Sequence, residues 1–349
     1  MRLFLLTLTF SAAAALPAQS TPGTLIVVNQ KQHAVDLVDP TDGKLLTAIN
    51  VGVNGHEIVV SKDQKLAYVP IYSNTGVGKV GTNGQFIDVI DLHQAKVVKS
   101  IDLGHPVRPH KPLFGPDGLL YVSAELDNAI DIVNPKTDKV IGQIPTGAPQ
   151  SHVFGISPDG RHAYTANVGS GSMSVLDLKT RKLLKVIPLT KTVQRVAISN
   201  DNRWVFTSDW DNPRVAVIDA QTNTLSRWIP TEGTPYVTQP TPDGRYLLVG
   251  ALKDHALKEG PGVLNIVDLH TWTVVRTIPT SAEVISFLVH DGRAYMSCAA
   301  NGAVEVLDVR SAHPEQWTLG PTIHLSPGVD AMAWTDIAWT DAAWTDAAH

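Results

Sequence analysis

The sequence predicts an all-β fold, a seven-bladed β-propeller with four-stranded blades, from two regular spacings and one displaced strand. An Asp that ends an alternating apolar strand returns about every 42 residues, and a turn Asp that precedes another strand returns at the same period. The first predicted strand has no inner strand before it, and a segment that matches the inner strands of the other repeats stands near the C-terminus. A small sheet repeated in this way can close into a ring.

Each repeat contains a tight turn between short alternating strands. In Ser157–Gly160 the Pro presets φ and the Gly supplies a positive φ, and Val215–Ile218 alternates with period two. The turn Asp stands at Asp63, Asp117, Asp159, Asp201, Asp243 and Asp291. The strand-ending Asp stands at Asp39, Asp91, Asp177, Asp219, Asp268 and Asp308, with Asn134 in the remaining repeat. Because no useful length shows helical periodicity, these spacings favour a propeller over a helical solenoid.

The two ends of the chain predict how the ring closes. The first strand, Thr24–Asn29, has no inner strand before it, and residues 328–336 resemble the inner-strand phrase Phe154–Asp159. We therefore predict that residues 328–336 complete the first blade, which leaves no open sheet edge and makes residues 24–336 the propeller. Residues 337–349 continue a Trp-Thr-Asp repeat of five residues that suits neither strand nor helix, so we expect a frayed, low-complexity tail. A Trp-rich segment for a partner is the alternative.

The phrase Ser157–Asn167 resembles the YVTN-type β-propeller repeat family, and the resemblance extends over nearly the whole mature chain. It implies the propeller fold and a secreted bacterial protein. Propellers related to this family include cell-surface proteins, lactonase-like enzymes and heme d1-type domains, so the resemblance does not select a function.

The first 18 residues have the features of a secretory signal peptide. Arg2 gives the positive start, Leu3–Phe10 is apolar, and small residues follow. This apolar stretch is too short to span a bilayer, so we expect a periplasmic or extracellular monomer with no membrane span after signal removal. The net charge of −5 without a basic tract argues against nucleic acid as a partner, and the single Cys298 excludes an internal disulfide.

Three histidines occupy equivalent positions, seven residues before the turn Asp of three consecutive repeats: His56, His110 and His152. Inner strands of propellers begin at one face, here called the top face, so these imidazoles should meet at the mouth of the central channel. Three imidazoles suit Zn or Cu and leave a position open for water, with Glu125 or Asp209 as a general base. Period two turns Glu57, the neighbour of His56, away from the channel. Alternatively, the histidines are repeat residues kept by duplication, and no cofactor is bound.

Further residues of the same face are candidates for ligand contacts. Aromatic side chains offer stacking surfaces and cationic ones suit an anionic ligand; the predicted ligand-binding residues are Tyr72, Arg108, Gln194, Arg195, Trp210 and Tyr236, with Lys111 beside them. The long loops at 72–85 and 253–262 are candidate lids. We therefore expect a secreted propeller that binds a small molecule, a metal or a protein at its His-lined top face. A metal-dependent hydrolase or lactonase-like enzyme is one alternative, and an envelope structural or protein-interaction propeller is another.

Overall fold

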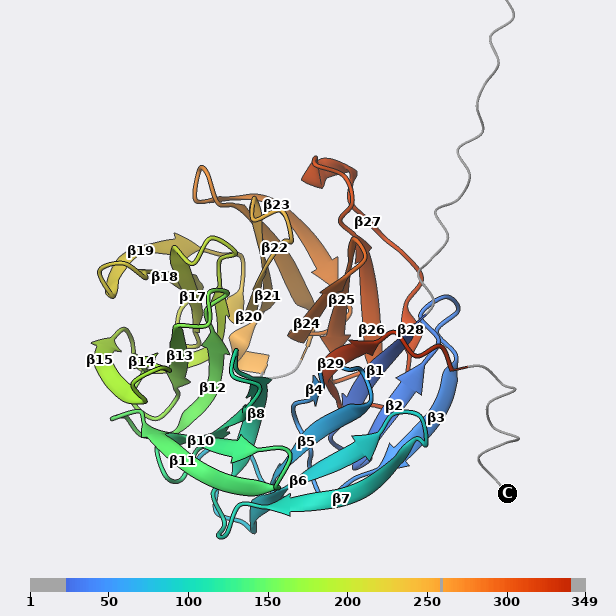
Figure 1. The fold of residues 1–349 in the computed structure, drawn as a ribbon. Coiled ribbons are helices and arrows are strands. Elements are labelled where there is room, and N and C mark those ends of the chain that lie inside the picture. The colour runs from blue at the N-terminus through green and yellow to red at the C-terminus, as the bar shows by residue number, and fades with distance from the viewer. Residues whose placement is uncertain (1–22, 258–259, 340–349) are drawn as a thin grey trace, which may run out of the picture.

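The computed structural model describes residues 23–257 and 260–339, which form seven antiparallel sheets set around a common axis (Figure 1). Within these two ranges the helical elements are two short 3-10 turns, η1 (His255–Leu257) and η2 (Pro314–Gln316). The predicted seven-bladed, all-β propeller is therefore confirmed. No helix in these ranges is long and apolar enough to cross a membrane. The predicted signal peptide, residues 1–18, lies outside the part that the structure describes.

Each blade runs outward from the axis as four strands, and the bounds follow blade by blade. Blade one contains β29 (Val329–Thr335), β1 (Thr24–Asn29), β2 (Ala34–Val38) and β3 (Leu45–Asn50). Blade two contains β4 (Val59–Val60), β5 (Leu66–Ser73), β6 (Asn83–Asp91) and β7 (Lys96–Asp102). Blade three contains β8 (Pro109–Phe114), β9 (Leu120–Ala124), β10 (Ala129–Asn134) and β11 (Lys139–Pro145). Blade four contains β12 (Ser151–Ile156), β13 (His162–Asn167), β14 (Ser172–Asp177) and β15 (Lys182–Pro188).

The remaining blades follow the same order. Blade five contains β16 (Val193–Ile198), β17 (Trp204–Asp209), β18 (Arg214–Asp219) and β19 (Thr224–Pro230). Blade six contains β20 (Thr234–Pro240), β21 (Tyr246–Leu252), β22 (Gly262–Asp268) and β23 (Thr273–Thr280). Blade seven contains β24 (Val284–His290), β25 (Arg293–Cys298) and β26 (Ala303–Asp308), and its outer edge is divided into β27 (Thr318–Leu319) and β28 (Ile323–His324). Pro321, which has no N–H to donate, stands between those two short strands.

Ring closure is as predicted. Strand β29 pairs antiparallel with β1, from Thr24 opposite Thr335 to Asn29 opposite Val329. The prediction that the tail frays from residue 337 is wrong for its first residues. The Trp339 side chain is buried in the core between blades one and two, and its indole N–H donates to the Leu92 carbonyl at 2.9 Å. Burial of this large apolar side chain outweighs the irregular five-residue repeat; residues 340–349 lie outside the described part.

The repeated Asp residues are turn residues that satisfy backbone N–H groups. Asp159 accepts hydrogen bonds from the Ser157 hydroxyl at 2.6 Å and the Arg161 amide at 3.0 Å. Asp219 accepts from the Gln221 amide at 2.8 Å. A short carboxylate that caps the backbone two residues on is favourable in every blade, which explains why the period was visible in the sequence.

Every inner strand carries a β-bulge near its start. In β16, Gln194 pairs with Ser208 but Val196 pairs with Thr207, so Arg195 is an extra residue. The same one-residue excess on the inner strand occurs in the other six blades. A bulge interrupts the alternation of side chains, so two consecutive residues can approach the channel.

Candidate functional site

The three predicted histidines meet at the start of the inner strands of blades two, three and four. The ring centroids of His56 and His110 are 5.0 Å apart, and those of His110 and His152 are 3.7 Å apart. Tyr72, on β5, presents its ring edge-on to all three at 5.1 to 5.7 Å. We call His56, His110 and His152 the histidine cluster. The equal register in sequence therefore did predict a shared location.

A second tier of charged side chains lies one register position further along the inner strands of four blades, two of which also carry a histidine of the cluster. Glu57 pairs with the Lys111 ammonium at 2.6 Å and with the Arg195 guanidinium. Arg195 also pairs with Asp330 at 3.2 Å. We call Glu57, Lys111, Arg195 and Asp330 the channel ion pairs. Because they come from blades one, two, three and five, they join strands that face each other across the channel.

Two carboxylates fix the orientation of two rings in the histidine cluster. His56 Nδ1 lies 3.1 Å from an Asp330 oxygen, and His152 Nδ1 lies 2.8 Å from Glu125 Oε2. An ionised carboxylate only accepts, so in the neutral rings the proton sits on Nδ1 and the lone pair on Nε2. Within the described chain, His56 Nε2 and both nitrogens of His110 are buried without a hydrogen-bond partner.

Glu125 lies beneath the histidine cluster rather than in a position open to solvent. It is 1% exposed and accepts a hydrogen bond from the Tyr72 hydroxyl at 2.7 Å as well as from His152. Burial alone would raise the pKa of Glu125, but the bonds from His152 and Tyr72 and the charge of Arg108 lower it below its usual value. The structure thus places Glu125 as a carboxylate that orients His152 and Tyr72.

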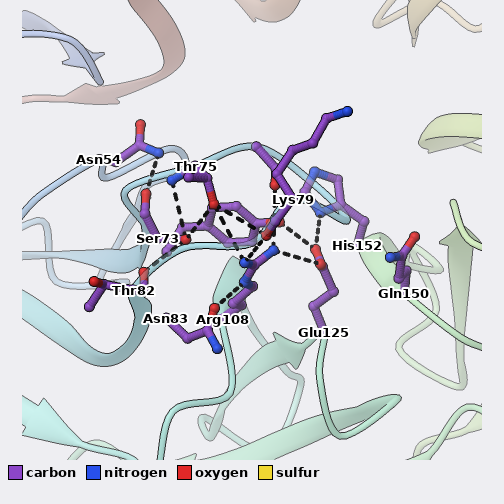
Figure 2. A network of polar contacts seen from close by, with 12 residues as sticks. Asn54, Ser73, Thr75, Lys79, Thr82, Asn83, Arg108, Glu125, Gln150 and His152 are labelled. Atoms are coloured by element: carbon purple, nitrogen blue, oxygen red, sulfur yellow. Dashed lines mark hydrogen bonds and ion pairs between the residues drawn. The ribbon is translucent and has the colours of Figure 1, made fainter.

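Arg108 holds the loop of residues 74–82, one of the two predicted lids (Figure 2). Its guanidinium donates to Asn83 Oδ1 at 2.6 Å and to the carbonyls of Gly76 and Lys79. The same group lies 3.8 Å from Glu125 and over the Tyr72 ring. Arg108 was predicted to contact an anionic ligand; the structure instead shows it 4% exposed and paired within the protein.

Burial sets the ionisation of the remaining groups. The pKa of His110 lies well below its usual range because the ring is buried, with further lowering from His152 and His56. Burial lowers the pKa of Lys111 to about 8, although Asp330 opposes the shift. Burial also raises the pKa of Tyr72 and Tyr236. The site therefore holds His110 as a neutral imidazole at neutral pH.

Aromatic side chains of blades five and six form the other side of the site. The Trp210 ring contacts Tyr236 at 5.1 Å and His255 at 4.8 Å, both edge-on. The Arg195 guanidinium lies 5.5 Å from the Tyr236 ring centre, which joins these rings to the channel ion pairs. The predicted stacking residues Trp210 and Tyr236 are thus brought together.

Two other predicted residues have more local surroundings. Asp209 is fully buried and accepts from the side chains of Asn212, in the loop that follows it, and Arg214, the first residue of β18 in the same blade. Gln194 is half-buried at the start of β16, where its backbone carbonyl accepts from Thr207. Because Arg195 is the extra residue of the bulge, it is Arg195, and not Gln194, that pairs with carboxylates across the channel in blade five.

The arrangement does not support the predicted Zn or Cu ion. Across residues 23–257 and 260–339, no group of three or more His, Cys, Asp or Glu side chains is placed to hold a metal ion. Imidazole nitrogens lie about 2.0–2.1 Å from a tetrahedral Zn, which keeps the ring centres roughly 5 Å apart. His110 and His152 are closer than that, because their rings pack against each other instead of converging on one point.

Sequence reasoning missed Glu57 and Asp330, although a signal for both exists. Glu57, Lys111 and Arg195 stand six residues before the turn Asp of their repeats, and Asp330 stands six residues before Asp336, the equivalent position of the closing segment 328–336. The prediction that Glu57 turns away from the channel is wrong, because the bulge suspends the period-two alternation at that point. Comparing both registers, six and seven residues back, would have identified the two tiers.

Comparisons with known proteins point to the same fold. The model of the cytochrome D1 heme domain matches residues 114–242. A Kuenenia stuttgartiensis hydrazine synthase structure is similar with a TM-score of 0.65 and 19% identity, over 82% of this chain and 96% of that chain. Dihydro-heme d1 dehydrogenase NirN in complex with DHE is similar with a TM-score of 0.63 and 14% identity, over 91% of this chain and 77% of that chain. A comparison with curated protein sequences gave no match.

These similarities show the propeller fold that the YVTN-type resemblance implied. The matching family model is the heme domain, however, and not the YVTN repeat family itself. The matched residues include His152 and Glu125 but neither His56 nor His110. At this level of identity the similarity does not carry a ligand over to this chain.

Proposed function

We propose that this protein is a ligand-binding propeller whose site is the histidine cluster at the mouth of the channel. The observation that carries the proposal is the set of unpartnered nitrogens at His56 and His110. Buried polar groups in native proteins nearly always have partners, and leaving one without costs about 1–3 kcal/mol. Several such atoms gathered at one place are typical of a site whose partner is a bound molecule.

The chemistry of the cluster favours a small ligand that donates hydrogen bonds. The carboxylate pairs leave Nε2 lone pairs on His56 and His152, and neutral His110 adds a further acceptor nitrogen. The cations of the site, Arg108, Lys111 and Arg195, are all paired with carboxylates. Equal numbers of opposite charges leave no excess for an anion, so a neutral donor such as a hydroxylated molecule is favoured.

A heme-type cofactor is the second candidate, favoured by the match to the cytochrome D1 heme domain. Imidazole nitrogens are suitable axial ligands of heme iron. The packing does not suit a macrocycle, because the rings of His110 and His152 contact each other and are only 1% and 4% exposed. A tetrapyrrole therefore does not fit between these rings as they stand, and we derive no chemistry through it.

Native mass spectrometry of protein purified from its source without a tag tests the proposal. We expect a mass excess above the apoprotein that disappears in the variant His56→Ala/His110→Ala/His152→Ala. The matched control replaces three histidines away from the site, His93, His162 and His270, and should keep the excess. A wild-type protein that carries no ligand, and that also takes up none from a hydroxylated-metabolite extract, would overturn the proposal.

Titration with hemin separates the two candidates. The small-ligand proposal expects no histidine-ligated absorption spectrum when hemin is added to the folded protein. A stoichiometric spectrum that is lost in the triple-histidine variant would keep the site and replace the ligand by a heme-type cofactor. Incubation with Zn or Cu provides the corresponding test for a metal ion.

We also propose that the protein works outside the cytoplasm, in the periplasm or the extracellular space. The support is the charged start, apolar stretch and small residues within positions 1–18. N-terminal sequencing of the mature protein should begin shortly after Ala18. A mature chain that retains Met1–Phe10 would contradict export.

A further inference from the structure

We infer that ring closure by β29 completes the ligand site, so that closure of the propeller and ligand binding stabilise each other. The inference rests on the proposed function and concerns the regulation of the same site. Its basis is one residue, Asp330, which belongs to the closing strand and also to the channel ion pairs.

Asp330 is 1% exposed, and three side chains from elsewhere in the ring surround it. One carboxylate oxygen lies 3.1 Å from His56 Nδ1, and Gln30 Nε2 lies 3.4 Å from the same oxygen. The other oxygen accepts from the Arg195 guanidinium at 3.2 Å. The backbone adds a bond from the Ala331 N–H to the His56 carbonyl at 3.3 Å. The last strand of the chain thus contacts blade two and blade five at the channel.

Opening of β29 would change the chemistry of the site without moving any other blade. His56 would lose the carboxylate that holds the proton on Nδ1, and with it the fixed lone pair on Nε2. Arg195 would keep only Glu57 as a charged partner. A ligand that needs the ordered cluster binds the closed ring alone, and by linkage it favours closure by the same factor.

The histidine cluster contains its own internal control. His152 is oriented by Glu125, which belongs to blade three and does not depend on the C-terminal strand. Loss of β29 pairing should therefore alter His56 and leave His152 unchanged. A general loosening of the propeller would alter both.

The first experiment reads the tautomers by ¹⁵N NMR of the histidine side chains in the full chain. In the wild type we expect His56 and His152 both to carry the proton on Nδ1. In Asp330→Ala, His56 should lose this preference while His152 keeps it. Asp131→Ala, which removes a buried carboxylate of blade three that bonds to Gln143, is the matched control and should change neither ring.

The second experiment weakens the closure without touching the site. Trp339→Ala removes the indole that anchors the segment after β29 on blade two, and hydrogen exchange is measured by mass spectrometry. We expect exchange about tenfold faster in residues 329–335 and also in residues 56–60, with little change in residues 151–156. Trp204→Ala, which removes an indole from blade five, should leave residues 329–335 and 56–60 as in the wild type.

The outcomes distinguish this inference from the proposed function. An unchanged His56 tautomer in Asp330→Ala, or faster exchange of residues 329–335 without any effect at 56–60, would overturn the coupling. Ligand occupancy of the wild type by native mass spectrometry tests the proposed function independently of β29. If the wild type carries ligand, Trp339→Ala should retain less of it than Trp204→Ala.

Discussion

Replacing His110 by Leu should stabilise the protein while it abolishes ligand binding. His110 is 1% exposed, and neither of its nitrogens has a hydrogen-bond partner in the described chain. Leucine has a similar volume and no polar atoms. A residue whose replacement improves folding is typical of a binding site, because function demands a strained or unsatisfied group there.

The magnitude follows from two opposing terms. Relief of the unsatisfied imidazole is worth about 1–3 kcal/mol. The lost ring contacts with Tyr72 and His152, at 5.1 and 3.7 Å, offset roughly 1 kcal/mol of this gain. We therefore expect His110→Leu to raise the free energy of unfolding by about 1 kcal/mol at pH 7.5.

The difference in the free energy of unfolding between His110→Leu and the wild type should grow as the pH falls. The folded pKa of His110 lies well below the value of 6.5 that the unfolded chain retains. Below that pH the unfolded state binds the extra proton, so the wild type loses up to about 1.4 kcal/mol per pH unit from this group. His110→Leu lacks the loss, and its advantage should reach about 2 kcal/mol at pH 5.5.

Urea unfolding followed by tryptophan fluorescence at both pH values measures these quantities. His162→Leu, at a partly exposed histidine of blade four, controls for the loss of a histidine as such. If His110→Leu is less stable than the wild type at pH 7.5, or if its advantage does not increase at pH 5.5, the view of His110 as an unsatisfied neutral imidazole is refuted.

Three further predictions concern neighbouring groups. Glu125→Gln should lower the free energy of unfolding by about 3 kcal/mol at pH 7, because Arg108 is left without its buried partner, as urea unfolding would show. Since the pKa of Glu125 is lowered, this stabilisation is present above pH 4.5 and lost as the pH falls through the folded pKa. If Glu125→Gln loses as much stability on acidification as the wild type, Glu125 is not the buried carboxylate that provides this stabilisation. Arg108→Ala should expose the 74–82 loop to limited proteolysis, whereas Arg161→Ala at an exposed turn should not; resistance in both would show that other contacts hold the loop. Burial raises the pKa of Glu283 to about 8, so an infrared band of a protonated carboxyl should persist at pH 7, vanish above about pH 9, and be missing in Glu283→Gln. The burial of this carboxyl costs stability as the pH rises from its unfolded value toward 8, so Glu283→Gln should be the more stable protein at pH 8.

The site was predictable in its location but not in its chemistry. The register of His56, His110 and His152 with the turn Asp placed them together, since equivalent positions in a repeat occupy equivalent heights in the ring. Glu57 was excluded by period-two alternation, a rule that holds only in the absence of a bulge. Sequence spacing also could not show that Glu125 bonds to Tyr72 and His152, because those contacts join blade three to blades two and four.

The sequence by itself determined the architecture of this protein. Turn carboxylates, positive-φ glycines and alternating apolar residues act locally, so each blade is specified by its own 42 or so residues, and the displaced strand 328–336 specified the closure. Only the tertiary structure decided which side chains meet across the channel, that Arg195 of blade five reaches Glu57 and Asp330, and that the rings of His110 and His152 pack together rather than around a metal. The physical reason is that these contacts depend on bulges and on distances between blades, which no local pattern encodes.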